Sequence, residues 1–230
     1  AAEEAEVAQK KAVEEAQKAA AEDEVGRAKA CFDGMKESYF RSLDWKGAAR
    51  ALSFLEKDPT NPFKTAEGSL QIQTELKKVA MMGSVQAIMQ RNLENYTFGR
   101  ADLRGWVCRK ATDSYLDIEK DGLSRKLTWV KFYDEYPGNM SELINKFIRF
   151  GNKNGTPRLT QRTQTEALLG AALTLRIICV KEATAATWAE QLAKEAVKRA
   201  NNPYYFNLAK EFFPDIDFSE VEKEIEANLI

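Results

Sequence analysis

The chain has 230 residues, of which 44% are hydrophobic and 30% charged, and its formal net charge is −1. These values suit one domain of ordinary size or two small ones, and they exclude a globally basic field for nucleic acid or an anionic membrane. Histidine is absent, which removes the commonest general base and the commonest transition-metal ligand.

The cysteines and the apolar runs narrow the chemistry further. No CxxC pair for a thiolate zinc site exists, because the three cysteines are far apart: Cys31, Cys108 and Cys179. They are either reduced, as buried small residues, or they form one disulfide and leave a spare thiol. The longest apolar run, residues 167–180, contains Arg176 and falls short of the roughly 20 residues that span a bilayer. We therefore expect no transmembrane segment.

No recognisable catalytic motif is present. The sequence has no glycine-rich phosphate loop and no GxSxG nucleophile elbow. A self-contained hydrolase without histidine would need a carboxylate pair in a cleft, and no such pair stands out. We therefore expect no enzymatic activity, no catalytic residue, no cofactor and no metal site.

Residues 1–24 are rich in alanine, glutamate, lysine and glutamine, which are strong helix formers. Alanines recur at helical spacing and form a narrow stripe of small side chains, at positions 1, 5, 8, 12, 16 and 19. This segment is either a solvated spacer helix or a close-packed seam for self-association. Its composition resembles the stalks that follow membrane anchors in bacterial envelope proteins, which favours the cell envelope or periplasm over the cytoplasm.

Residues 25–95 are expected to form N-terminal helical hairpins, with interruptions at Gly26 and Gly34. An apolar face of period 3.6 runs through residues 45–55, and "KDPTNPF" ends this helix because proline cannot continue it. The aromatic, small and leucine positions followed by "DPTNP" resemble the second helix of tetratricopeptide-type repeats, which implies repeat-like antiparallel hairpins. Residues 63–94 predict a long helix with a break at Gly68 or Gly83.

Residues 96–133 differ from their surroundings because apolar and polar residues alternate. Alternation predicts strands at 105–110, 114–119 and 125–131, and Asp121-Gly122 predicts a hairpin turn. A further short strand before residue 105 would complete a small SH3-like barrel. The segment resembles the small β inserts of large helical-repeat proteins from some bacteria.

The aromatic residues of this insert have two interpretations. Either Trp106 and Trp129 form the core of the sheet with Leu116, or Trp106 or Tyr115 lies on an exposed face and binds a partner, as aromatics do at interfaces. Basic residues outnumber acidic ones here, but the interleaved carboxylates argue against nucleic acid as the partner: Asp113, Asp117, Glu119 and Asp121.

Residues 134–230 predict C-terminal helical hairpins. "WAEQLAKEAVKRANNP" repeats the earlier order of an aromatic, small residues and an Asn-Pro stop, which points to a divergent duplication. The expected fold class is therefore mainly α (α+β), with repeat-like antiparallel helical hairpins and a three- to five-stranded antiparallel insert.

Two functional hypotheses follow. The first is a non-enzymatic interaction scaffold that binds a protein or peptide through its helical surface and the insert. The second is a regulatory or accessory module of a larger envelope-associated protein or enzyme, since the chain starts at Ala1 rather than at a methionine.

Overall fold

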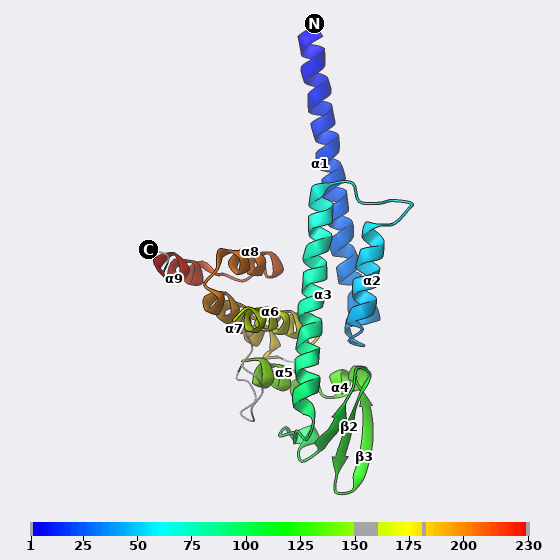
Figure 1. Ribbon diagram of the computed structural model, residues 1–230, viewed down its shortest axis with the longest axis vertical. Coiled ribbons are helices and arrows are strands. Elements are labelled where there is room, and N and C mark those ends of the chain that lie inside the picture. The colour runs from blue at the N-terminus through cyan, green and yellow to red at the C-terminus, as the bar shows by residue number, and fades with distance from the viewer. Residues whose placement is uncertain (1, 150–160, 181–182, 229–230) are drawn as a thin grey trace. The chain divides into compact units, whose positions relative to one another are not determined.

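The computed structural model describes residues 2–149, 161–180 and 183–228, and these are mainly helical with one small antiparallel sheet (Figure 1). This confirms the predicted fold class. The longer elements in chain order are α1 (Ala2–Met35), α2 (Trp45–Glu56), α3 (Ala66–Leu93), β1 (Val107–Ala111), β2 (Tyr115–Lys120), β3 (Leu123–Thr128), α4 (Trp129–Glu135), α5 (Pro137–Ile144), α6 (Gln161–Ile177), α7 (Ala185–Ala200), α8 (Pro203–Phe212) and α9 (Ser219–Asn228). Short helical turns occur at Lys36–Phe40, Ala101–Leu103 and Asn145–Arg149.

The chain divides into two compact units. The first unit comprises Ala1–Tyr39 with Asp44–Val79, and the second comprises Phe40–Leu43 with Ala80–Ile230. The division falls within α3, so this helix contributes residues to both units.

In the first unit, α1 continues through both glycines that the sequence analysis expected to interrupt it. That expectation is wrong because the face of α1 that packs in this unit buries Ala28, Phe32 and Met35 at spacings of four and three residues. Burial of these side chains offsets the cost of each glycine in a helix, about 1 kcal/mol.

Helix α2 ends just before "KDPTNPF", as the sequence predicts. The side chain of Asp44 accepts a hydrogen bond from the backbone N–H of Gly47, which caps the helix, and α2 packs against α1. Beyond its end, Asp58 Oδ1 accepts hydrogen bonds from the N–H and the hydroxyl of Thr60, at 2.8 and 2.6 Å. This side-chain turn diverts the chain away from a helical path.

Helix α3 is the predicted long helix, and it has no break at Gly68 or Gly83. Its start is held by Glu24 of α1, whose carboxylate accepts hydrogen bonds from the backbone N–H groups of Lys64 and Thr65 at 2.7 and 2.9 Å. Gly68 is required here, because a Cβ atom at this position would collide with Glu24. Figure 1 shows α1, α2 and the first half of α3 lying alongside one another.

In the second unit, α6 and α7 form a closely packed hairpin. A Cβ atom at Gly170 of α6 would collide with the backbone carbonyl of Met81, so only glycine fits this approach. The predicted "NNP" stop is confirmed: Asn201 ends α7 in the left-handed conformation, and the Asn202 side chain accepts a hydrogen bond from the N–H of Tyr204.

The insert contains three strands in the order β1-β2-β3, all antiparallel. The segment before residue 105 contributes a single bridge, Thr97 to Val107, rather than a further strand. The expected third strand also ends early, because the Thr128 hydroxyl accepts a hydrogen bond from the N–H of Lys131 and starts α4. Trp129 is therefore a buried helical residue, not a strand residue.

Candidate interaction face on the small sheet

The centre of the sheet's inner face is fully buried. Cys108, Leu116, Ile118 and Leu127 have no solvent exposure, and they come from all three strands. Trp129 closes one end, since its indole N–H donates a 2.7 Å hydrogen bond to the carbonyl of Thr112. This face therefore belongs to the core, and any partner must use another surface of the sheet.

The turn between β2 and β3 sets the register of the hairpin. Asp121 and Gly122 both have positive φ, at 52° and 81°, as a two-residue type I′ turn requires. The pairing then runs without a bulge from Lys120 opposite Leu123 to Tyr115 opposite Thr128. The predicted hairpin is confirmed.

The outer face of the sheet is polar, and its side chains interact with one another. Arg109 forms an ion pair with Glu119 at 3.1 Å, and the Ser124 hydroxyl donates to Asp117 at 3.2 Å. The Lys126 ammonium lies 4.9 Å from the centre of the Tyr115 ring, a cation–π geometry. Tyr115 is therefore on the outer face, as predicted, but it is half-buried beneath Lys126.

The two aromatic residues proposed to bind a partner do not form one patch. Trp106 precedes β1 beside the end of the ladder where Val107 pairs with Glu119, whereas Tyr115 lies at the other end of β2. Tyr115 and Glu119 are four positions apart along the strand, which corresponds to about 13 Å. Trp106 is half-buried, and its backbone carbonyl accepts a hydrogen bond from the N–H of Phe98. Partner binding by Trp106 and partner binding by Tyr115 therefore stay two separate predictions.

The two edges of the sheet differ. The β1 edge is covered by the preceding segment: the N–H of Cys108 donates to the carbonyl of Tyr96, and the carbonyl of Cys108 accepts from the N–H of Asn95. Among the described residues, no strand pairs with the far side of β3. Sequence reasoning missed this edge, although the Asp-Gly turn and Lys126 on the last strand were signals for it.

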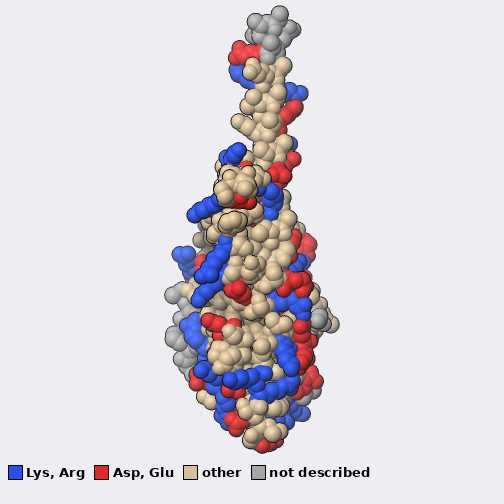
Figure 2. Space-filling model, turned by 90° about the vertical axis from the view of Figure 1, so that its right-hand side faces the viewer, with Lys and Arg blue, Asp and Glu red and all other residues tan. Residues whose placement is uncertain are grey.

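Figure 2 faces the β3 side of the molecule. In this view Lys and Arg side chains gather across the sheet at the lower end, with acidic side chains at their flank. Arg125 of β3 forms an ion pair with Glu135 at 3.2 Å, and Lys131 reaches the same carboxylate at 3.6 Å. Lys126 forms no ion pair with any described residue. Positive charge is therefore in excess along this edge.

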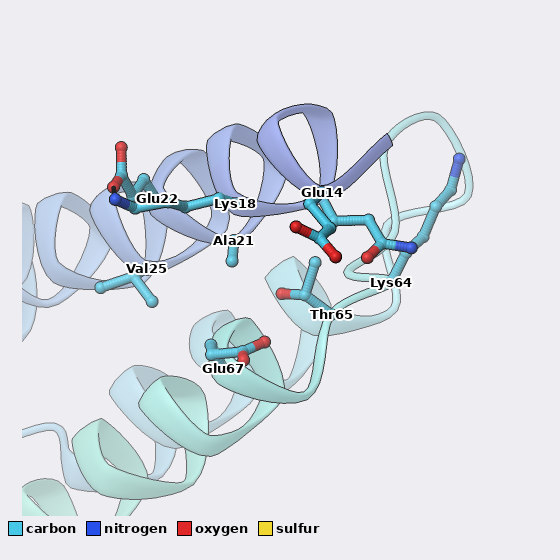
Figure 3. A pocket seen from close by; sticks show the side chains of 9 residues that line it. Glu14, Lys18, Ala21, Glu22, Val25, Lys64, Thr65 and Glu67 are labelled. Atoms are coloured by element: carbon cyan, nitrogen blue, oxygen red, sulfur yellow. Dashed lines mark ion pairs between the residues drawn. The ribbon is translucent and has the colours of Figure 1, made fainter. Parts of the chain in front are cut away.

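A hollow in the first unit lies between α1 and the start of α3. Its volume is about 670 Å³, and Figure 3 shows Glu14, Lys18 and Ala21 on one side and Thr65 and Glu67 on the other. Acidic and basic side chains are mixed around it, and Glu24 already occupies the N–H groups at the helix start. The hollow therefore has no preference for an anionic or a cationic ligand.

The cysteines are free thiols, so no disulfide joins them. Burial raises the pKa of Cys108 to about 11, despite an opposing backbone hydrogen bond at Lys110. Burial also raises the pKa of Cys31. Both thiols are therefore protonated at neutral pH, and neither is an activated nucleophile.

Within residues 2–149, 161–180 and 183–228, no cluster of His, Cys, Asp and Glu side chains has the composition and proximity to hold a metal ion. No helix in the same ranges combines the length and apolar character needed to cross a membrane.

Comparison with known proteins adds no relative. No protein-family model matches the chain, and neither a curated protein nor a solved structure does so.

Proposed function

We propose that the chain is a non-enzymatic protein-interaction module in which helices hold a small sheet that receives a protein or peptide partner. The observation that carries this proposal is the asymmetry of the sheet. The centre of one face is buried and one edge is covered, whereas the polar face with Tyr115 and the edge of β3 face solvent.

The rigidity of the sheet supports this role. Its inner face is anchored by fully buried residues, and α4 follows β3 directly and packs against it. A surface held in this way loses little conformational entropy when a partner binds, which favours affinity. The half-exposed rings of Trp106 and Tyr115 are the residue types that contribute most to protein interfaces.

Site-specific photo-crosslinking tests the proposal. A photoreactive amino acid at Tyr115 of the full chain should capture a defined partner from an extract of the source cells. The same amino acid at Glu211, an exposed residue of α8, is the matched control. Crosslinks at both positions, or at neither, would contradict an interaction face on the sheet.

The Trp106→Ala and Tyr115→Ala variants complete this test. Each should reduce partner capture while the far-UV circular dichroism spectrum and melting temperature stay close to those of the parent chain. If both variants capture the partner as well as the parent does, the aromatic residues are not part of the interface.

Self-association through α1 is a second candidate, favoured by the exposure of this helix. Residues 6–20 are all exposed, including Val7 and Val13, which are 62% and 50% exposed. Ion pairs between residues four apart, such as Glu6 with Lys10 at 3.0 Å, stabilise this part of the helix. Four alanines of the stripe, Ala8, Ala12, Ala16 and Ala19, lie on this exposed segment, and their small side chains allow close packing against a second copy.

Removal of residues 1–20 distinguishes a self-association seam from a solvated spacer helix. This truncation retains Glu24, so the contact between α1 and α3 stays intact. A self-associating seam predicts that sedimentation velocity will show a smaller assembly after truncation. A spacer helix predicts the same assembly state before and after.

A further inference from the structure

The outer edge of β3 carries backbone groups that point away from the sheet. A two-residue hairpin turn makes its flanking residues a hydrogen-bonded pair, here Lys120 with Leu123, and such pairs then alternate along the ladder. The N–H and carbonyl groups of Ser124 and Lys126 therefore face outward. Outside the β2–β3 ladder, no backbone hydrogen bond in the described part of the chain reaches either residue.

The shape of this edge suits the addition of a strand. β3 has six residues, or about 20 Å of extended chain, and pairs with β2 without a bulge. The only irregularity in the sheet is in β1, between Cys108 and Lys110. Leu123 at the start of β3 is 68% exposed and offers an apolar contact beside the open backbone groups.

We infer that the β3 edge binds an extended acidic segment of a partner protein as a fourth strand of the sheet. This inference rests on the proposed function and names the class of partner. Backbone hydrogen bonds to Ser124 and Lys126 supply the pairing, as in other complexes formed by strand addition. Charge supplies the selectivity, chiefly through Lys126 on the outer face. Arg125 projects to the opposite face, where it and Lys131 share the single carboxylate of Glu135, so positive charge is in excess there as well.

A second copy of the chain is a poor occupant of the same edge. Antiparallel pairing of two β3 strands through these outward groups would place either Lys126 opposite Lys126 or Arg125 opposite Arg125 of the other copy in the two most central registers. Like charges directly opposite destabilise a strand pair, and lysine on an edge strand is a known barrier to self-pairing. The same charges attract glutamate or aspartate on a different strand.

Nucleic acid is also a poor occupant. The outward N–H and carbonyl groups of Ser124 and Lys126 can form a ladder with a peptide backbone, whereas a nucleic acid has no backbone amides to pair with them. Tyr115 is covered by Lys126, so its ring is not open for a base to stack on.

The test uses the full chain and three fluorescent probes in an anisotropy titration. The first probe is a short peptide of alternating glutamate and valine, and the second is the same peptide with alternate backbone amides methylated. The third is a thymidine oligonucleotide. The inference predicts binding of the unmodified peptide, and binding weaker by about tenfold or more for the methylated peptide, which cannot complete the ladder.

Variants of the chain locate the site. Lys126→Glu should weaken peptide binding by about tenfold or more, whereas Lys110→Glu, the same charge change on an exposed residue of β1, should have a smaller effect. Ser124→Pro removes an outward N–H and should also abolish binding, whereas Ser124→Ala loses the same side-chain hydrogen bond to Asp117 but keeps the N–H.

Each other result overturns the inference. Equal binding of both peptides shows attraction by charge alone, and binding of only the oligonucleotide shows a nucleic-acid surface. Peptide binding that survives Lys126→Glu and Ser124→Pro places the site elsewhere. If no peptide binds but the crosslink at Tyr115 still captures a partner, the interaction module stands and the strand-addition mode fails.

Discussion

Replacement of Glu24 by glutamine should destabilise the first unit. The side chain is 5% exposed, and its carboxylate accepts hydrogen bonds from the N–H of Lys64, the N–H of Thr65 and the Thr65 hydroxyl, at 2.7, 2.9 and 2.5 Å. Glutamine keeps the shape of this side chain but turns one accepting oxygen into a donor that faces other donors. Hydrogen bonds to a charged group contribute about 1.5–3 kcal/mol each, and the variant keeps some of them. We expect Glu24→Gln to lower the free energy of unfolding by about 2–4 kcal/mol.

The pH dependence of this effect has a definite sign. Burial raises the pKa of Glu24, but the hydrogen bonds from the Thr65 hydroxyl and from the two N–H groups outweigh it, so the pKa in the folded chain lies below the ordinary value of 4.5. A carboxyl group with a depressed pKa adds stability above its unfolded pKa, and this contribution is lost as pH falls through the folded pKa. The difference between parent and Glu24→Gln should therefore be largest above pH 4.5 and should shrink in more acidic solution.

Urea denaturation and hydrogen exchange measure this prediction together. Exchange monitored by mass spectrometry should be faster in Glu24→Gln for peptides covering residues 24–35 and 64–75. Glu67→Gln is the matched control, because it makes the same chemical change at an exposed residue in the first turn of α3. The control should change stability by a few tenths of a kcal/mol to about 1 kcal/mol, the range for a charge near a helix start. Equal stability and equal exchange in parent and Glu24→Gln would refute the reasoning.

Further predictions concern the glycines and one cysteine. Gly170→Ala should lower the free energy of unfolding by about 1–3 kcal/mol, because the added methyl group would collide with the carbonyl of Met81. Gly34→Ala should instead raise the free energy of unfolding by about 0.5–1 kcal/mol, since nothing lies within 4 Å and alanine favours the helix; thermal melts that rank the two variants in the opposite order would contradict the packing. Cys108 should resist N-ethylmaleimide at neutral pH, because it has no solvent exposure and its pKa is raised to about 11. Intact-mass analysis with peptide mapping, before and after unfolding, measures how much of Cys108 is labelled. Rapid labelling of Cys108 in the folded chain would show that the inner face opens.

Sequence patterns performed best where the determining interactions are local. The end of α2 follows from Asp58 and Thr60, two residues apart, and the end of α7 follows from Asn201 and Asn202. The β2–β3 hairpin follows from the preference of Asp-Gly for positive φ. Sequence reasoning failed at Gly26 and Gly34, because the helix there is maintained by packing of Phe32 and Met35 rather than by intrinsic propensity.

The candidate site was predicted only in part. Alternation placed Tyr115 on the outer face correctly, since a strand has a period of two. It could not show that Lys126 would cover the ring, that Trp129 would leave the sheet for α4, or that residues 95–98 would cover the β1 edge. Each of these outcomes depends on which segments meet in three dimensions.

The sequence by itself therefore determined the fold class, the helix stops and the hairpin, because neighbouring residues carry the relevant steric and hydrogen-bonding preferences. Only the tertiary structure decided that Glu24 holds the start of α3 about 40 residues away, and that Gly170 must approach Met81. The open edge of β3 is a tertiary outcome as well. Contacts between distant residues leave no periodic signal in the chain, because each one depends on the complementary shape and charge of a segment elsewhere in the sequence.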